Sequence, residues 1–99
     1  MNLKGIKYFE NIGYKLKTQS NIWIIFEKPD PHPFLEEDGT LSHFYSNDTI
    51  IIYLKPQGLL KRKYIYNEND MIDSFYEASL NPLELEVCCR FIQENNLFK

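Results

Sequence analysis

Six side chains that could bind a metal ion lie within one short stretch of the sequence. They are Asp30, His32, Glu36, Glu37, Asp38 and His43. Carboxylate and imidazole groups are common ligands of Ca²⁺ and Zn²⁺, but these residues have neither zinc-finger nor EF-hand spacing and form no H-E-x-x-H motif. We therefore expect no metal site, and we interpret Glu36, Glu37 and Asp38 as part of a solvated acidic loop.

The two cysteines, Cys88 and Cys89, are the remaining candidates for catalysis. A Cys-His hydrolase would pair one of them with His32 or His43, and it needs an exposed thiol of lowered pKa. Cys88 falls on the apolar side of a predicted helix, where a free cysteine behaves as a small buried hydrophobe. Cys89 lies at the edge of that side and is the more reactive candidate. The sequence has no Gly-rich phosphate loop, dinucleotide fingerprint or nucleophile elbow, so we predict neither a cofactor nor an enzymatic activity.

A basic segment rich in tyrosine raises the question of nucleic-acid binding. Its residues are Lys55, Lys61, Arg62, Lys63, Tyr64 and Tyr66. Tyrosines that stack on bases between phosphate contacts are typical of single-strand binders. Because side chains alternate along a strand, we expect Leu60, Tyr64 and Tyr66 to face the core while the lysines face solvent. This arrangement would separate the tyrosines from the lysines, which argues against nucleic-acid binding. Nucleic-acid binding is therefore our second hypothesis, and it predicts an affinity for nucleic acid that falls steeply as the salt concentration rises.

The strongest candidate for a binding surface is a set of apolar residues on two predicted strands: Trp23, Ile25, Ile51 and Tyr53. They alternate with a second apolar set, which comprises Ile22, Ile24, Phe26, Ile50 and Ile52. Both faces of the central strands are therefore apolar. Two interpretations remain open, because the second face is either covered within the monomer or forms an interface with a partner or a second copy. A helix, or Phe34 and Leu35 of the acidic loop, would provide the cover.

Two helices are predicted with identifiable ends. Residues 2–12 have amphipathic spacing, and Gly13 fits a left-handed C-terminal cap. Asn81 followed by Pro82 and Glu84 is a strong helix start, so a second helix is expected from residue 82 to about residue 95. Residues 67–79 are ambiguous, since Met71, Ile72, Phe75 and Tyr76 fit helical spacing whereas the Asn-rich entry fits a loop. A short helix is the prediction, with a loop as the alternative.

Strands are predicted at residues 14–19, 22–27, 41–45, 49–54 and 59–66. The long segment 28–40 contains three prolines and is expected to be a loop. Lys55-Pro56-Gln57-Gly58 has the residues of a type II turn and should close a hairpin. The order of elements predicts one α+β domain of residues 1–99, an antiparallel sheet of three to five strands flanked by N-terminal and C-terminal helices in two layers.

The composition agrees with a single soluble domain. The chain has 99 residues, 43% of them hydrophobic and 25% charged, with a formal net charge of -3. This balance argues against disorder, and the mild acidity disfavours non-specific nucleic-acid binding. No apolar run is long enough to span a membrane and residues 1–13 lack the apolar region of a signal peptide, so we expect a cytoplasmic protein without membrane contact.

The N-terminal segment carries a Phe-Glu-x-x-Gly-Tyr pattern at Phe9, Glu10, Gly13 and Tyr14. In this pattern, in the strands at 22–28 and 50–54, and in the apolar tail at 92–98, the chain resembles small uncharacterised phage and prophage proteins of low-GC Gram-positive bacteria. The resemblance transfers no catalytic residues. It implies an accessory protein of a mobile element that acts by binding a host or phage protein, such as a host defence or regulatory factor that it would inhibit.

Protein binding is thus the leading prediction. Its proposed contacts are Trp23, Ile25, Ile51 and Tyr53, with Glu36, Glu37 and Asp38 as a second contact. An acidic loop beside an apolar patch could imitate nucleic acid toward a basic partner.

Overall fold

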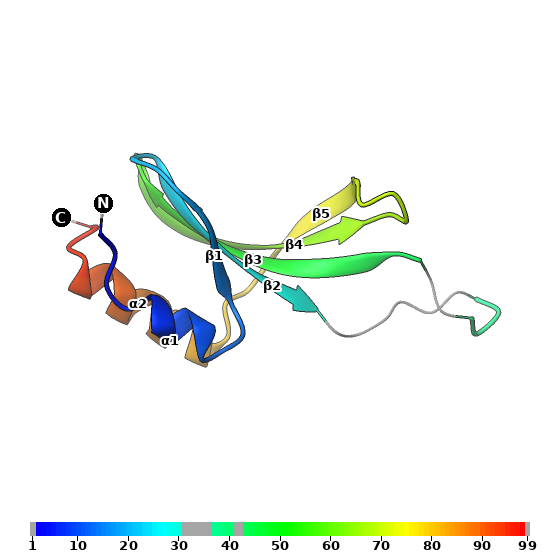
Figure 1. The fold of residues 1–99 in the computed structure, drawn as a ribbon, viewed down its shortest axis with the longest axis horizontal. Coiled ribbons are helices and arrows are strands. Elements are labelled where there is room, and N and C mark those ends of the chain that lie inside the picture. The colour runs from blue at the N-terminus through cyan, green and yellow to red at the C-terminus, as the bar shows by residue number, and fades with distance from the viewer. Residues whose placement is uncertain (1, 31–36, 41–42, 99) are drawn as a thin grey trace.

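A computed structural model describes residues 2–30, 37–40 and 43–98 and confirms the predicted α+β class (Figure 1). The elements in chain order are α1 (Ile6–Glu10), β1 (Lys15–Gln19), β2 (Trp23–Asp30), β3 (Tyr45–Leu54), β4 (Gln57–Tyr66), β5 (Ile72–Ala78) and α2 (Pro82–Glu94). The five strands form one sheet in the order β1-β2-β3-β4-β5, and each neighbouring pair is antiparallel. Every strand therefore pairs with its neighbours in the sequence.

Both helix caps that the sequence predicts are present. Gly13 has φ 93°, and the backbone N–H groups of Gly13 and Tyr14 donate to the carbonyls of Glu10 and Phe9, as in a Schellman motif. At the start of α2, the Asn81 side chain accepts from the Glu84 N–H at 2.8 Å, and the Glu84 carboxylate accepts from the Asn81 N–H at 2.9 Å. These capping interactions are local, so they could be predicted from sequence.

The first helix is shorter than the predicted residues 2–12. Gly5 has φ 78° and precedes the first helical turn. The backbone of Lys4 bonds instead to the Asn95 side chain at the end of α2, with its N–H donating at 2.8 Å and its carbonyl accepting at 2.9 Å. A tertiary contact thus holds the residues before α1 in a non-helical path.

The predicted helix at residues 67–79 is wrong, because this segment forms a turn and strand β5. The Asn67 side chain accepts from the backbone N–H groups of Asn69 and Met71, and Asp70 has φ 60°, so the chain reverses directly after β4. The spacing of Ile72, Phe75 and Tyr76 fits a helix, but the segment pairs with β4 as an antiparallel strand instead.

Three further local predictions need correction. The loop expected at 28–40 starts later, because β2 runs to Asp30 and its last three residues pair with β3. The β3–β4 hairpin is present, but its turn is Lys55-Pro56 with a cis peptide bond between these residues, which is type VI rather than type II. The predicted strand at 41–45 is only partly described, since residues 41 and 42 lie outside the described residues and β3 begins at Tyr45.

The hydrophobic core lies between the two helices and one face of the sheet. Phe9 of α1 stacks on Phe26 of β2 with ring centroids 3.7 Å apart, and Phe91 of α2 meets both rings edge to face. The same cluster contains Tyr14, Ile24, Ile50, Ile52, Val87 and Cys88. The strand residues of this cluster occupy alternate positions on β2 and β3, so both helices cover the same face.

The sheet is longer than the helices that cover it. The molecule measures 51 × 23 × 21 Å. Figure 1 shows both helices under one end of the sheet, while β5, the adjoining end of β4 and the beginning of β3 extend beyond them. We call this uncovered part the distal end.

Candidate interaction surface

The sheet face opposite the helices, which we call the open face, carries the predicted apolar set. Trp23 lies in register with Tyr53, and Ile25 with Ile51, on neighbouring strands. Cross-strand partners share a face, so the four residues lie together and away from α1 and α2. The possibility that a helix covers them is therefore excluded, while Phe34 and Leu35 lie outside the described residues.

The four residues differ in how accessible they are. Trp23 is 40% exposed, and its ring meets Tyr53 edge to face at 6.3 Å. Ile51 is only 4% exposed, since it lies in the central strand between Ile25 and Leu60. Trp23 is therefore the most accessible of the four residues, and Ile25 and Tyr53 are half-buried beside it. Ile51 packs beneath them and is almost inaccessible.

The predicted orientation of the basic hairpin is wrong. Lys61 lies in register with Ile50 and Leu60 with Ile51, so the lysines share the helix-covered face while Leu60 belongs to the open face. Tyr64 and Tyr66 alternate with the lysines and also lie on the open face. The prediction placed the apolar residues of β4 toward the helices. In the structure a buried carboxylate of α2 lies there instead, and it pairs with Lys61.

That carboxylate belongs to Glu84, which is 2% exposed. Lys61 donates to both of its oxygens, at 2.9 and 3.0 Å, and the Tyr14 hydroxyl donates to Oε2. Burial opposes ionisation, but the hydrogen bonds from Tyr14, Asn81 and Lys61 outweigh it, so the pKa of Glu84 is lowered. Leu83, the residue before Glu84, is by contrast 54% exposed.

The other cations of the hairpin are also dispersed. Lys63 donates to Asp30 at 2.6 Å and lies 3.5 Å from Asp48, and the bond to Asp30 raises the pKa of Lys63. Arg62 points to the open face, where its guanidinium lies 5.0 Å from the ring centroid of Phe75. Lys55 is exposed in the turn. The four cations therefore do not form one surface that could follow a phosphate backbone.

The acidic loop is described in part. Glu37 and Asp38 are exposed, whereas Glu36 lies outside the described residues. Asp38 accepts from the Thr40 hydroxyl at 2.7 Å and from the Thr40 N–H at 3.0 Å, and these bonds lower the pKa of Asp38. The described part of the loop thus presents the carboxylates of Glu37 and Asp38 to solvent.

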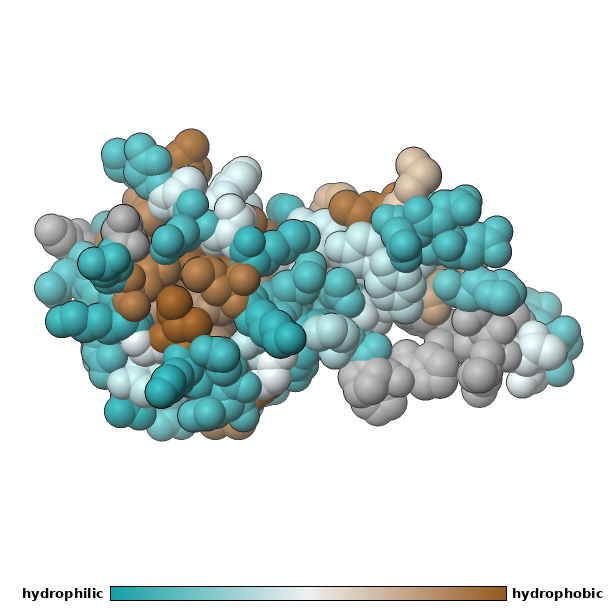
Figure 2. Space-filling model, in the orientation of Figure 1, coloured by the Kyte–Doolittle hydropathy of each residue, from teal (hydrophilic) through white to brown (hydrophobic). Residues whose placement is uncertain are grey.

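A second apolar area lies at the distal end, and the sequence analysis missed it. The exposed large residues there are Phe44, Tyr45, Met71, Ile72, Phe75 and Tyr76. Figure 2 shows apolar residues over β5, beside the hydrophilic β4–β5 turn, separated by polar surface from a larger apolar area at the helix-covered end. The turn sequence Asn-Glu-Asn-Asp after β4 was the available signal, because such a cluster between two β-rich runs is typical of a hairpin.

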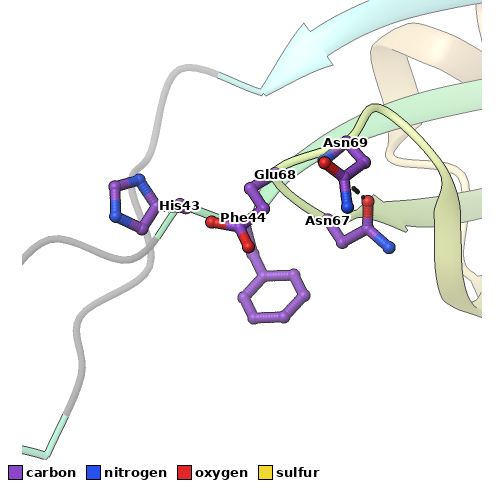
Figure 3. Close-up of a pocket in the computed structure, with 5 residues that line it drawn as sticks. All are labelled: His43, Phe44, Asn67, Glu68 and Asn69. Atoms are coloured by element: carbon purple, nitrogen blue, oxygen red, sulfur yellow. Dashed lines mark hydrogen bonds between the residues drawn. The ribbon is translucent and has the colours of Figure 1, made fainter.

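A shallow pocket of about 190 Å³ adjoins this turn (Figure 3). It is lined by His43, Phe44, Asn67, Glu68 and Asn69. These five side chains comprise a phenyl ring, an imidazole, one carboxylate and two amides. Such a mixture suits a polar or basic side chain better than a purely apolar ligand.

The two cysteines lie next to each other on α2 but differ in exposure. Cys88 is buried and burial raises the pKa of Cys88 to about 12, whereas Cys89 is exposed. In the part of the chain that the structure describes, no group of three or more His, Cys, Asp or Glu side chains is arranged to hold a metal ion. Two of the six candidate ligands, His32 and Glu36, lie outside the described residues.

Native alkylation should distinguish the two thiols. We expect iodoacetamide at neutral pH to modify Cys89 and to leave Cys88 unmodified, because a buried thiol of raised pKa offers neither access nor thiolate. Mass spectrometry of wild type, Cys88→Ala and Cys89→Ser measures this. Label on folded Cys89→Ser would contradict the expectation, and both thiols should react in urea.

No protein-family model matches the chain, and no curated protein or solved structure is significantly similar to it. Within residues 2–30, 37–40 and 43–98, no helix is long and apolar enough to cross a membrane.

Proposed function

We propose that the chain is a non-enzymatic protein-binding domain that contacts its partner through the open face. One observation carries the proposal: both helices pack on the opposite face, while the open face presents Trp23, Ile25 and Tyr53 side by side on β2 and β3. Aromatic residues on an otherwise polar surface are enriched at protein interfaces, where they supply much of the binding energy. Glu37 and Asp38 would add an acidic contact that favours a basic partner.

Nucleic-acid binding has less support from the geometry. It would require Lys61 and Lys63 to contact phosphates, but both are engaged in ion pairs on the helix-covered side. Lys55 and Arg62 then remain as the accessible cations of the predicted site. The origin in a mobile element and the inhibition of a host factor stay predictions of the sequence resemblance.

Affinity capture with a matched pair of variants tests the proposal. The tagged protein is incubated with lysate of a low-GC Gram-positive bacterium, treated with nuclease and washed at moderate salt, and bound proteins are identified by mass spectrometry. We expect a stoichiometric partner for wild type and for Asn21→Glu, and loss of that partner for Trp23→Glu. Both variants add one negative charge near the β1–β2 turn, but only Trp23→Glu alters the apolar surface.

Circular dichroism must first show that Trp23→Glu is folded. Retention of the partner by folded Trp23→Glu would refute the use of the open face. Recovery of nucleic acid that disappears with nuclease or salt would instead support the basic residues as the site.

A further inference from the structure

Strand β5 forms an edge of the sheet that the fold leaves unprotected. Among the described residues, β5 has a hydrogen-bonded neighbour only in β4, and every side chain from Ile72 to Glu77 is exposed. The pairings of both edge strands contain one register shift, between Leu16 and Thr18 of β1 and between Ile65 and Tyr66 of β4 beside β5, but only β1 carries exposed lysines, Lys15 and Lys17. Lysines are a usual means of preventing strand addition, and β5 contains none.

Aromatic side chains flank this edge on both faces of the sheet. Phe75 lies in register with Tyr64 on the open face, with ring centroids 5.5 Å apart, and is 54% exposed. Tyr76 lies in register with Lys63 on the other face and is 51% exposed. A strand added beside β5 would therefore find an aromatic contact for its side chains on either face.

The charge of this region favours a basic occupant. Residues 67–80 contain four acidic side chains, Glu68, Asp70, Asp73 and Glu77, and no lysine or arginine. A second copy is disfavoured, because antiparallel pairing centred on Phe75 would place Asp73 of each copy opposite Glu77 of the other. Like charges in such cross-strand positions are destabilising, whereas Lys or Arg would be attracted.

We propose that β5 binds an extended segment of a partner protein in which apolar residues alternate with Lys or Arg, so that this segment becomes a sixth strand of the sheet. Main-chain hydrogen bonds to the free edge supply affinity. Side chains alternate along a strand, so the apolar residues of the segment lie on one face beside Tyr76. Its Lys or Arg residues lie on the other face beside Phe75 and Glu77, where the acids of this region attract them. This inference rests on the proposed protein-binding function and names the chemistry of the partner.

A peptide titration tests the proposal without the natural partner. The probe is a blocked ten-residue peptide of alternating valine and lysine, compared with the same peptide carrying glutamate in place of lysine. In ¹⁵N NMR spectra at low salt, we expect the lysine peptide to shift the amide signals of residues 72–78 and the glutamate peptide to leave them unchanged. Shifts confined to the open face around Trp23, or equal binding of both peptides, would overturn the proposal.

Charge-reversal variants provide the control. We expect D73K/E77K to weaken binding of the lysine peptide at least about tenfold, since two attractive contacts become repulsive. E10K/E86K makes the same net change on exposed helix positions and should alter the affinity less than about twofold. Equal loss in both variants would reveal a non-specific charge effect and refute the edge site.

The same variants separate this proposal from the proposed function. If D73K/E77K keeps the lysate partner that Trp23→Glu loses, binding through the open face is supported and binding at the edge of β5 is refuted. If neither variant loses the partner, both proposals are refuted. A dimer of the wild-type chain by analytical ultracentrifugation, disrupted in Phe75→Ala, would show that a second copy occupies β5 and would overturn the basic-segment proposal.

Discussion

Replacing Glu84 with Gln is expected to lower the free energy of unfolding by about 3–5 kcal/mol, because it leaves the Lys61 ammonium buried without its counter-charge. The side chains of Glu84 and Lys61 are only 3% and 12% exposed. Gln retains the size of the side chain and can still complete the capping box with Asn81, so the variant isolates the charge. A domain is stabilised by only about 5–15 kcal/mol, so this loss should be large in urea unfolding.

The exposed Glu86→Gln on the same helix is the matched control, and we expect it to change stability by less than about 0.5 kcal/mol. Equal effects of the two variants would contradict the role of the buried ion pair. An unchanged slope of the unfolding free energy against urea concentration would show that the variant unfolds in the same two-state manner as wild type.

The dependence on pH gives a second measurement of the same pair. The usual pKa of Glu84 is 4.5, and its pKa in the folded protein is lower. The unfolded chain therefore binds the proton first as pH falls, so the stabilisation is complete above about pH 4.5 and is lost as pH falls through the folded pKa. We expect the stability difference between wild type and Glu84→Gln to narrow over this range. A difference that stays constant from pH 7 to pH 3 would refute the assignment.

Truncating Phe26 to Ala should have a comparable effect, about 3–5 kcal/mol, because it removes the ring that joins both helices to the sheet. Phe26 is fully buried and contacts Phe9 and Phe91. Its loss leaves a cavity, and it also removes edge-to-face and stacked ring contacts. Thermal or urea unfolding measures the change.

Phe75→Ala removes the same side chain from β5 and is the appropriate comparison. Phe75 is 54% exposed, so we expect a cost of about 1 kcal/mol or less. The pair thus separates residues that hold the fold from residues available for binding. A cost for Phe75→Ala similar to that of Phe26→Ala would mean that the distal end is part of the stabilising core.

Local interactions explain which parts of the fold could be predicted from sequence. The Gly13 cap, the Asn81–Glu84 capping box and the β3–β4 hairpin each depend on residues a few positions apart, and all three are present. The alternation of Trp23 and Ile25 with Ile24 and Phe26 correctly separated two strand faces, because side chains alternate in any extended strand. The exposed Lys15 and Lys17 of β1 follow the same rule.

Contacts between distant segments determine two features that the sequence pattern did not predict, the strand β5 and the orientation of the β4 side chains. Ile72, Phe75 and Tyr76 fit a helix by spacing, and only pairing with β4 makes this segment a strand, in which the second candidate site lies. Hydropathy alone placed Leu60 toward the core and Lys61 toward solvent. Glu84 reverses this arrangement, because a buried carboxylate on α2 needs a cation beside it.

By itself, therefore, the sequence determined the α+β class, the ends of α2 and the existence of two apolar strand faces. The tertiary structure decided which face the helices cover, where the basic side chains point and which strands form the edges of the sheet. The physical reason is that caps and alternation depend on neighbouring residues, whereas burial, ion pairing and exposure depend on segments that meet only after folding.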